Sequence, residues 1–167
     1  DSDTALVEPF LTLGVPREEI SFGHPIEVEC RRLGIEVDDY VDAYDTSVAQ
    51  PFPGVSDLIA AMRSWSICSN KAARSGRAEL ARLGWTPEVV WFADDFGGEA
   101  KALGPMLTEL GATGPEVMFV GDTAHDHACA EAVGARFAWA GWNPRTRAAS
   151  PDGLVLQRPL DLLDHIV

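Results

Sequence analysis

From residue 53 to residue 166, short apolar runs alternate with segments of helical spacing, and this alternation strongly limits the folds open to the chain. Strands that alternate with helices of this length form βαβ units, which assemble into a parallel sheet. We therefore expect an α/β fold, a Rossmann-like three-layer α/β/α architecture with a parallel sheet. The expected strands are residues 64–68, 89–92, 116–120, 136–139 and 154–156, and the expected helices are residues 55–63, 72–83, 100–110, 126–133 and 159–166.

The segment before residue 51 has a different character. Two stretches, 26–33 and 37–44, have helical spacing, and the segment contains no apolar run that predicts a strand. Proline and glycine interrupt it repeatedly, which favours short helices. We interpret residues 9–50 as a small helical insertion and expect residues 1–8 and 51–167 to form the α/β core.

Composition excludes several classes of protein. Hydrophobic residues make up 46% of the 167 residues and charged residues 23%, which is typical of a globular chain. A net charge of −13 argues against binding to nucleic acid or to an anionic membrane surface, and no apolar run is long enough to span a bilayer. The cysteines, Cys30, Cys68 and Cys129, include no C-x-x-C pair, which favours buried thiols in a reducing compartment such as the cytoplasm. The oligomeric state is not indicated.

The sequence opens with two carboxylates separated by one residue, Asp1 and Asp3. After a strand, this spacing lets both side chains face one side, and their mutual repulsion favours a bound cation. A sheet that presents them in this way needs a strand before residue 1, outside the sequence given. A turn or a solvated acidic surface is the alternative reading.

A second acidic pair, Asp122 and Asp126, follows the apolar run 117–120. Asp122 is expected at the tip of this strand and Asp126 in the first turn of the next helix, on the same side. In open parallel sheets, ligands bind beyond the carboxyl ends of the strands. Two carboxylates there suit Mg²⁺, which prefers oxygen ligands and retains several waters. Alternatively, the pair stabilises the start of the helix.

Polar residues also follow two other strands. Ser69 and Asn70 lie between the expected strand 64–68 and a helix, a setting that suits a phosphate oxygen. Lys101, one of two lysines in the chain, lies near another strand end, where an ammonium can neutralise an anionic ligand. A helix-capping serine and a surface lysine are the alternatives. Trp142 and Asn143 follow the strand that ends at residue 139 and could line the entrance to the same edge.

Taken in order, these motifs resemble those of the haloacid dehalogenase-like hydrolase superfamily, in the subgroup with a helical cap. Within that subgroup, the chain is most similar to the phosphoglycolate phosphatase-like members. Residues 9–50 would then be the cap. The resemblance rests on residues 69–71, 121–126, 130, 132–135, on the return from the cap at 52–55, and on the last strand and helix at 152–166. The chain departs from the usual first motif, because Thr4 and Ala5 stand where the family commonly has glycine and threonine.

The resemblance implies a role for each residue of the reacting group. Asp1 would be the nucleophile that forms an aspartyl-phosphate, and Asp3 would be the general acid and then the general base. Ser69, Asn70 and Lys101 would bind the phosphoryl group, and Lys101 would also hold the Asp1 carboxylate.

The resemblance also implies a Mg²⁺ ion. Asp1, the backbone carbonyl of Asp3 and Asp122 would bind it directly, and Asp126 would bind it directly or through water. Together with Lys101, the ion supplies about three positive charges against the repulsion between an anionic nucleophile and an anionic phosphate.

The reaction expected from the resemblance is hydrolysis of a phosphate monoester of a small metabolite. Asp3 disfavours dehalogenation, because a halide leaves without a proton. The cap contains no lysine, which disfavours phosphonate cleavage through a Schiff base. Two alternatives stay open: a sugar-phosphate mutase with the same motifs, and a catalytically silent protein of the same fold that works by binding.

Overall fold

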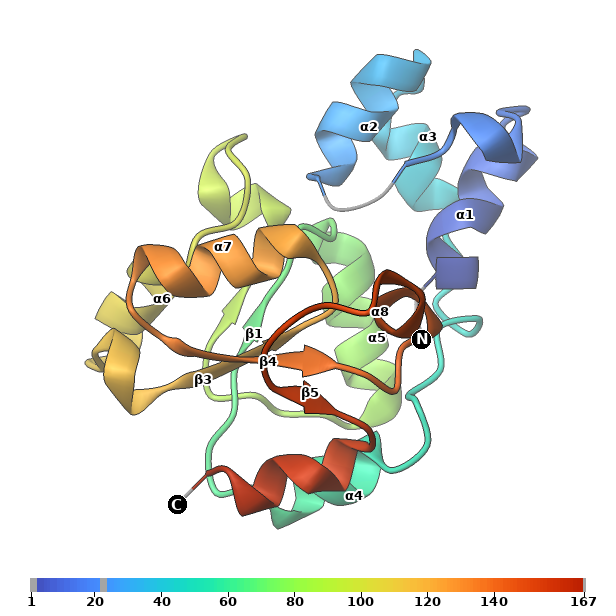
Figure 1. Ribbon diagram of the computed structural model, residues 1–167. Coiled ribbons are helices and arrows are strands. Elements are labelled where there is room, and N and C mark those ends of the chain that lie inside the picture. Colours follow the sequence, from blue (N-terminus) through green and yellow to red (C-terminus); the bar gives the residue numbers. More distant parts are fainter. Residues whose placement is uncertain (1–2, 22–23, 167) are drawn as a thin grey trace. The chain divides into compact units, whose positions relative to one another are not determined.

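The computed structural model describes residues 3–21 and 24–166, with Asp3 described by its backbone alone (Figure 1). The chain divides into two compact units, one of residues 1–50 and 66–101 and the other of residues 51–65 and 102–167. The expected division into a cap of residues 9–50 and a core is a different partition, and it stays a prediction.

The first unit combines a helical group with a short parallel sheet (Figure 1). Strands β1 and β2 pair in parallel, with Ile67 opposite Val90. Its elements are α1 (Asp3–Thr12), the 3₁₀ helix η1 (Arg17–Glu19), α2 (Ile26–Leu33), α3 (Val37–Asp42), β1 (Ile67–Cys68), α5 (Ala73–Leu83), β2 (Val90–Trp91) and the 3₁₀ helix η2 (Ala93–Phe96).

Aromatic side chains form the centre of the helical group. The rings of Phe10 and Tyr40 lie 4.5 Å apart between centroids, and those of Tyr40 and Tyr44 lie 6.2 Å apart. Tyr40 is buried, and its hydroxyl donates a hydrogen bond to the Leu6 carbonyl at 3.1 Å, so the polar end of the ring is satisfied inside the core. The contact joins α1 to α3 across 34 residues of sequence.

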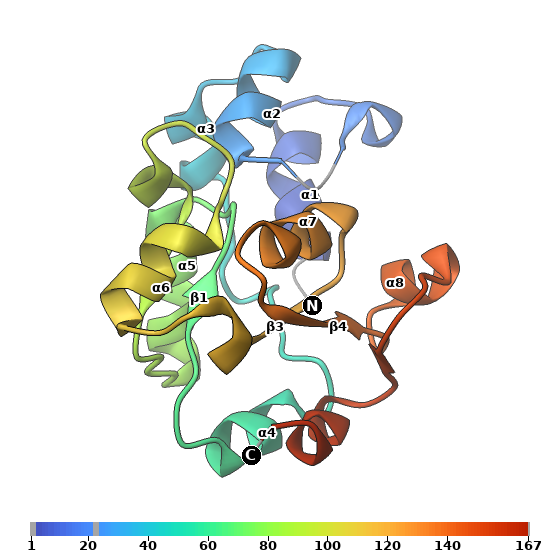
Figure 2. The same ribbon diagram turned by 60° about the vertical axis from the view of Figure 1, so that its left-hand side comes forward.

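The second unit is a three-stranded parallel sheet with helices on both faces. The strand order is β3-β4-β5, and Figures 1 and 2 show α4 and η4 on one face and α7 on the other. Its elements are α4 (Val55–Ala61), α6 (Leu103–Leu110), the 3₁₀ helix η3 (Gly114–Glu116), β3 (Met118–Gly121), α7 (Ala124–Ala132), β4 (Arg136–Ala140), α8 (Pro144–Ala149), β5 (Val155–Leu156) and the 3₁₀ helix η4 (Pro159–Asp164).

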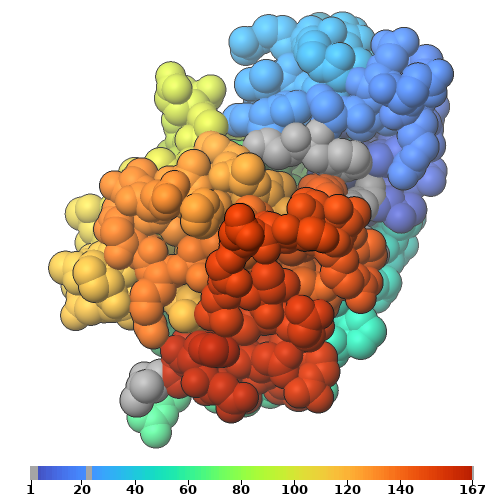
Figure 3. All heavy atoms as spheres, in the orientation of Figure 1, coloured from blue at the N-terminus to red at the C-terminus, as the bar shows by residue number. Residues whose placement is uncertain are grey.

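Alternation along the strands explains how this sheet is covered. Ala138 and Leu156 pack against Leu58 of α4 and Leu162 of η4 in one apolar cluster. Phe137, which precedes Ala138 in β4, contacts His127 of α7 on the opposite face, with 5.1 Å between ring centroids. On the near side of the space-filling view, the residues coloured orange to red form one continuous surface (Figure 3). The predicted α/β fold with parallel strands is thus confirmed.

The local structure differs from the sequence-based prediction in three places. The helix expected from residue 100 begins at Leu103, because Pro105 fits only in a first turn. The expected helix 159–166 is a 3₁₀ helix over Pro159–Asp164. Helix α8 was not predicted, although its signal is present: Asn143 caps the helix and Pro144 occupies the first position.

Other expectations are confirmed. The expected helix 26–33 corresponds to α2, and Gly84 and Gly111 end α5 and α6 with φ values of 66° and 64°. The three cysteines are buried, and none of them forms a disulfide among the described residues. Within residues 3–21 and 24–166, no helix has the length and apolarity needed to cross a membrane.

Gly76 of α5 offers a test of the packing in the first unit. A Cβ atom at this position would come within 2.3 Å of the Phe92 ring, so we expect Gly76→Ala to lower the free energy of unfolding by about 1–3 kcal/mol. Gly104→Ala on α6 is the control, since apart from its chain neighbours and its own helix backbone no atom lies within 4 Å of its added Cβ. It should be neutral or slightly stabilising. Urea denaturation measures both, and equal effects would contradict the packing described.

Candidate functional site

The predicted site residues are divided between the two units. Ser69, Asn70 and Lys101 belong to the first unit, and Asp122 and Asp126 belong to the second. Asp1 lies outside the described residues. Asp3 is the first residue of α1, and its side chain is likewise outside the description.

The loop that follows β1 is fixed on several sides. The Ser69 backbone N–H donates to the Trp91 carbonyl at 2.9 Å, and the Ser69 hydroxyl oxygen accepts from the Lys71 N–H at 3.2 Å. The first of these bonds ties the loop to β2, and the second forms a tight local turn. Ser69 is therefore part of an ordered loop at a strand end, as the sequence predicts.

Asn70 joins three segments that are distant in sequence. Its backbone carbonyl accepts the Ile26 N–H at 3.3 Å at the start of α2. Its side-chain Oδ1 accepts the Lys101 backbone N–H at 2.9 Å. The structure thus brings the second motif and the predicted lysine together through Asn70, whereas contact between Asn70 and a substrate stays a prediction.

Lys101 precedes α6 and is not part of it, because the helix begins at Leu103. Its side chain is partly buried, and its backbone is held by Asn70. The lysine therefore extends from a segment whose position depends on the Ser69–Lys71 loop. Sequence reasoning did not foresee this hydrogen bond, which joins residues 31 positions apart.

The other lysine, Lys71, is largely buried and bound by side chains of the protein interior. Lys71 Nζ lies 2.6 Å and 2.7 Å from the two Glu79 carboxylate oxygens and 2.9 Å from the Tyr44 hydroxyl. Burial lowers the pKa of Lys71, and the attraction of Glu79 opposes that shift. Burial and the hydrogen bond to Glu79 both raise the pKa of Tyr44. Lys71 is thus an internal cation that connects α5, Tyr44 and the loop after β1.

In the second unit, Asp126 is buried and closes the start of α7. Its Oδ2 accepts from the backbone N–H groups of Asp122 at 3.1 Å and Thr123 at 2.9 Å, and from the Thr123 hydroxyl at 2.7 Å. In return, the Asp126 N–H donates to Thr123 Oγ1 at 3.2 Å, which completes a capping box. These contacts are the helix-stabilising alternative considered for this pair, while metal binding by Asp126 stays a prediction.

Gly121 allows Asp126 to lie against the end of β3. A Cβ atom at residue 121 would come within 2.3 Å of Asp126 Cβ, so a larger residue would displace the carboxylate. The glycine before Asp122 in the sequence motif therefore has a steric explanation.

Asp122 follows the last residue of β3 and is partly exposed. Its Oδ2 accepts a hydrogen bond from Asn143 Nδ2 at 2.7 Å and lies 3.5 Å from Arg145 Nη1. Sequence reasoning placed Asn143 near this edge but did not identify its contact with Asp122, and it did not consider Arg145. Only the N-cap signal Asn143-Pro144 could have suggested an ordered turn there.

The Asp122 carboxylate is chemically suited to Mg²⁺. It is a hard oxygen donor at the carboxyl end of a parallel strand, and a side-chain hydrogen bond orients it. Across the part of the chain that is described, no three His, Cys, Asp or Glu side chains gather into a metal site. Mg²⁺ often binds through one or two carboxylates with waters and substrate phosphate, so the residues present fit this ion.

Comparison with known proteins identifies the family of this chain. Residues 8–140 match the sequence profile of the haloacid dehalogenase-like hydrolases. The chain belongs to this family. The match includes the loop after β1, Lys101, the acidic pair after β3 and all of β4.

A relative of this haloacid dehalogenase-like chain is the phosphoglycolate phosphatase of Synechococcus elongatus. The two are 35% identical over 128 residues, which cover 70% of this chain and 59% of that protein. The chain thus spans less than two thirds of the length of this relative.

Solved structures have the same fold. A candidate phosphoglycolate phosphatase from Lactobacillus plantarum gives a TM-score of 0.71 at 21% identity, covering 96% of this chain and 88% of that one. A hydrolase from Pseudomonas syringae gives 0.69 at 18% identity, covering 97% and 88%.

Two ion pairs of the first unit should differ greatly in how much unfolding free energy is lost when the cation is removed. The side chains of Lys71 and Glu79 are 11% and 13% exposed, so Lys71→Met leaves a buried carboxylate without its cation and should cost about 3–5 kcal/mol of unfolding free energy. Arg74 and Asp42 form a 2.7 Å pair with side chains 70% and 66% exposed, so Arg74→Met should cost less than about 1 kcal/mol.

Denaturant titration of both variants measures the difference. Adding Glu79→Leu and Tyr44→Phe to Lys71→Met should recover much of the loss, because no charge or hydroxyl of the cluster is then left buried without a partner. A loss for Lys71→Met no larger than that for Arg74→Met would contradict the buried pair.

Proposed function

We propose that this protein is a Mg²⁺-dependent phosphatase that hydrolyses a phosphate monoester of a small metabolite through an aspartyl-phosphate. Membership of the haloacid dehalogenase-like hydrolases supports this, as does the likeness to a phosphoglycolate phosphatase. The observation that carries the proposal is the Asn70–Lys101 hydrogen bond, because it joins the two motifs that would bind the phosphoryl group.

In the proposed first step, an Asp1 carboxylate oxygen attacks phosphorus. The bond between phosphorus and the ester oxygen breaks, and Asp3 donates its proton to that leaving oxygen. In the second step, Asp3, now a carboxylate, removes a proton from water. The water oxygen attacks phosphorus, the bond between phosphorus and the Asp1 oxygen breaks, and phosphate leaves with the Asp1 carboxylate restored.

The other site residues would hold the phosphoryl group and the cation. Ser69, Asn70 and Lys101 would bind phosphoryl oxygens, and Lys101 would also neutralise Asp1. Asp122, with Asp1 and the backbone carbonyl of Asp3, would hold Mg²⁺, and Asp126 would do so directly or through water. The bound ion supplies positive charge that offsets repulsion between the nucleophile and the phosphate.

The substrate class follows from charge and from the relative. A net charge of −13 disfavours nucleic acid as a partner, so small phosphorylated metabolites are proposed. Phosphoglycolate is one candidate, because the relative from Synechococcus elongatus is named a phosphoglycolate phosphatase. The cysteines are buried and form no disulfide among the described residues, which suits a reducing compartment, and we propose the cytoplasm.

The test is phosphate release by the full-length protein from phosphoglycolate, other phosphorylated metabolites and p-nitrophenyl phosphate. We expect release with Mg²⁺ and none with excess EDTA. Asp122→Asn should lower kcat/KM by at least about 100-fold, because it removes a charged ligand of the cation.

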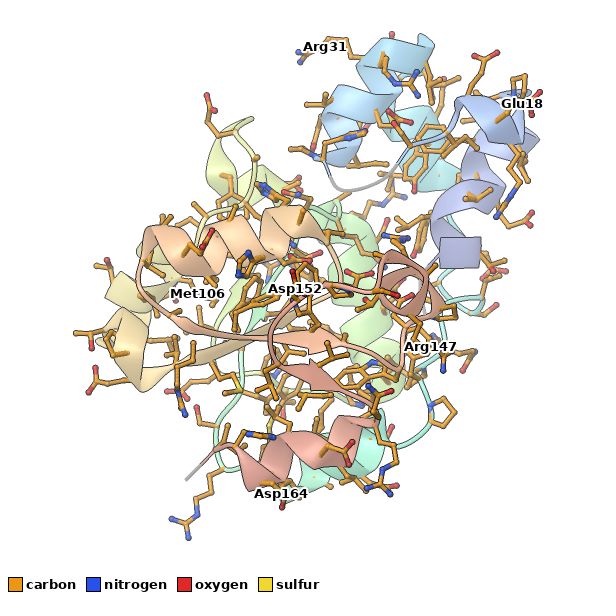
Figure 4. All side chains as sticks on the ribbon, viewed as in Figure 1. Glu18, Arg31, Met106, Arg147, Asp152 and Asp164 are labelled. Carbon is orange, nitrogen blue, oxygen red and sulfur yellow. The ribbon has the colours of Figure 1, made fainter. Side chains whose placement is uncertain are left out.

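Asp164→Asn is the matched control, since Asp164 is exposed at the end of η4 (Figure 4), and it should leave kcat/KM unchanged. Release that persists in EDTA would contradict the proposed cation. Failure of the folded protein to act on any ester would favour the mutase or the binding alternative.

A further inference from the structure

We propose that Asn143 and Arg145 set the affinity of Asp122 for a divalent cation, in opposite directions. Asn143 would raise this affinity by orienting the carboxylate, and Arg145 would lower it by competing as a positive charge. The inference rests on the proposed function, because that function assigns a cation to Asp122. Both residues act through Asp122, so they are positioning residues and not catalytic ones.

Both ends of the Asn143 amide have defined partners. Its Nδ2 donates to Asp122 Oδ2 at 2.7 Å, and its Oδ1 accepts from the Arg145 backbone N–H at 2.9 Å. Rotating the amide by half a turn would place an acceptor against a carboxylate and a donor against an N–H, so a single orientation is favoured. Asn143 is only 7% exposed, so solvent offers little compensation for a lost partner.

The backbone around Asn143 is also anchored. The Asn143 N–H donates to the Ala140 carbonyl at 2.9 Å, directly after β4. Gly141 lies so close to β5 that an added Cβ would come within 2.6 Å of the Leu156 carbonyl oxygen. Thr146, in the first turn of α8, is fully buried. The amide that holds Asp122 is therefore carried by a rigid turn between β4 and α8.

Arg145 acts on the same carboxylate by charge. Its Nη1 lies 3.5 Å from Asp122 Oδ2, and the two side chains are 30% and 29% exposed. A guanidinium is charged at every pH at which the protein is folded, so it attracts Asp122 whether or not a cation is present. A divalent cation that binds Asp122 must share the carboxylate with this charge or displace it, and either lowers the cation affinity.

The two residues therefore predict shifts of opposite sign in one measurement. Asn143→Ser keeps a hydroxyl that can cap α8 but removes the donor to Asp122, and the dissociation constant for Mg²⁺ should rise by about 10-fold. Arg145→Gln removes the competing charge, and the constant should fall by about two- to fivefold, the size expected for a partly exposed ion pair.

The experiment is isothermal titration calorimetry of the full-length protein with Mg²⁺, without substrate. Arg147→Gln is the control. Arg147 is an exposed arginine on the same helix (Figure 4), and among the described residues it makes no contact with Asp122, so this substitution removes the same charge at a distance from the carboxylate. It should change the constant less than Arg145→Gln does. Thermal unfolding of each variant establishes that it is folded.

Each outcome decides the proposal. Opposite shifts for Asn143→Ser and Arg145→Gln support it, since damage to the fold would move both constants the same way. Shifts of one sign, or equal effects of Arg145→Gln and Arg147→Gln, overturn it. If wild type does not bind Mg²⁺, the inference and the proposed cation fail together. If the opposite shifts occur but no ester is hydrolysed, the inference stands and the phosphatase function fails.

Discussion

The two hydrogen bonds accepted by Asn70 organise the first unit. One fixes the start of α2 through Ile26, and the other fixes the backbone of Lys101. Because Lys71, the next residue, is held in the interior by Glu79 and Tyr44, the loop after β1 is tied to the helical group and to α5 at the same time. The phosphate-binding role that we propose for this loop requires such rigidity, since phosphoryl transfer depends mainly on positioning and charge.

Carboxylates in this acidic chain are stabilised by local donors of different kinds. Asp126 is held by backbone N–H groups and a hydroxyl at the start of α7. Glu29 is buried, which raises its pKa, but hydrogen bonds from Arg32, Ser21 and His24 outweigh burial and lower that pKa to about 2. Asp122 differs from both, because it is partly exposed and has a buried amide on one side and an arginine nearby. Its carboxylate therefore suits the cation-binding role that we propose for it.

The fold could be predicted from local sequence signals. The site could be predicted only in part, because its hydrogen bonds join residues that are far apart in sequence. Spacing and glycine caps located α2, α5 and the strands of the second unit, because these depend on nearby residues. The late start of α6 followed from Pro105, which could have been weighed from sequence. The Asn70–Lys101 and Asn143–Asp122 hydrogen bonds join residues 31 and 21 positions apart, and no local pattern specifies them. They exist because parallel strands bring their carboxyl ends to one edge.

We propose that Asp1 carries the phosphoryl group during turnover. The most direct test is acid quenching of the full-length protein during turnover of its best substrate with Mg²⁺, followed by mass spectrometry of its peptides. We predict one phosphoryl group on the peptide that contains Asp1, removable by hydroxylamine and absent from Asp1→Asn. Turnover at the wild-type rate by Asp1→Asn, or a phosphoryl group on another residue, would contradict the account.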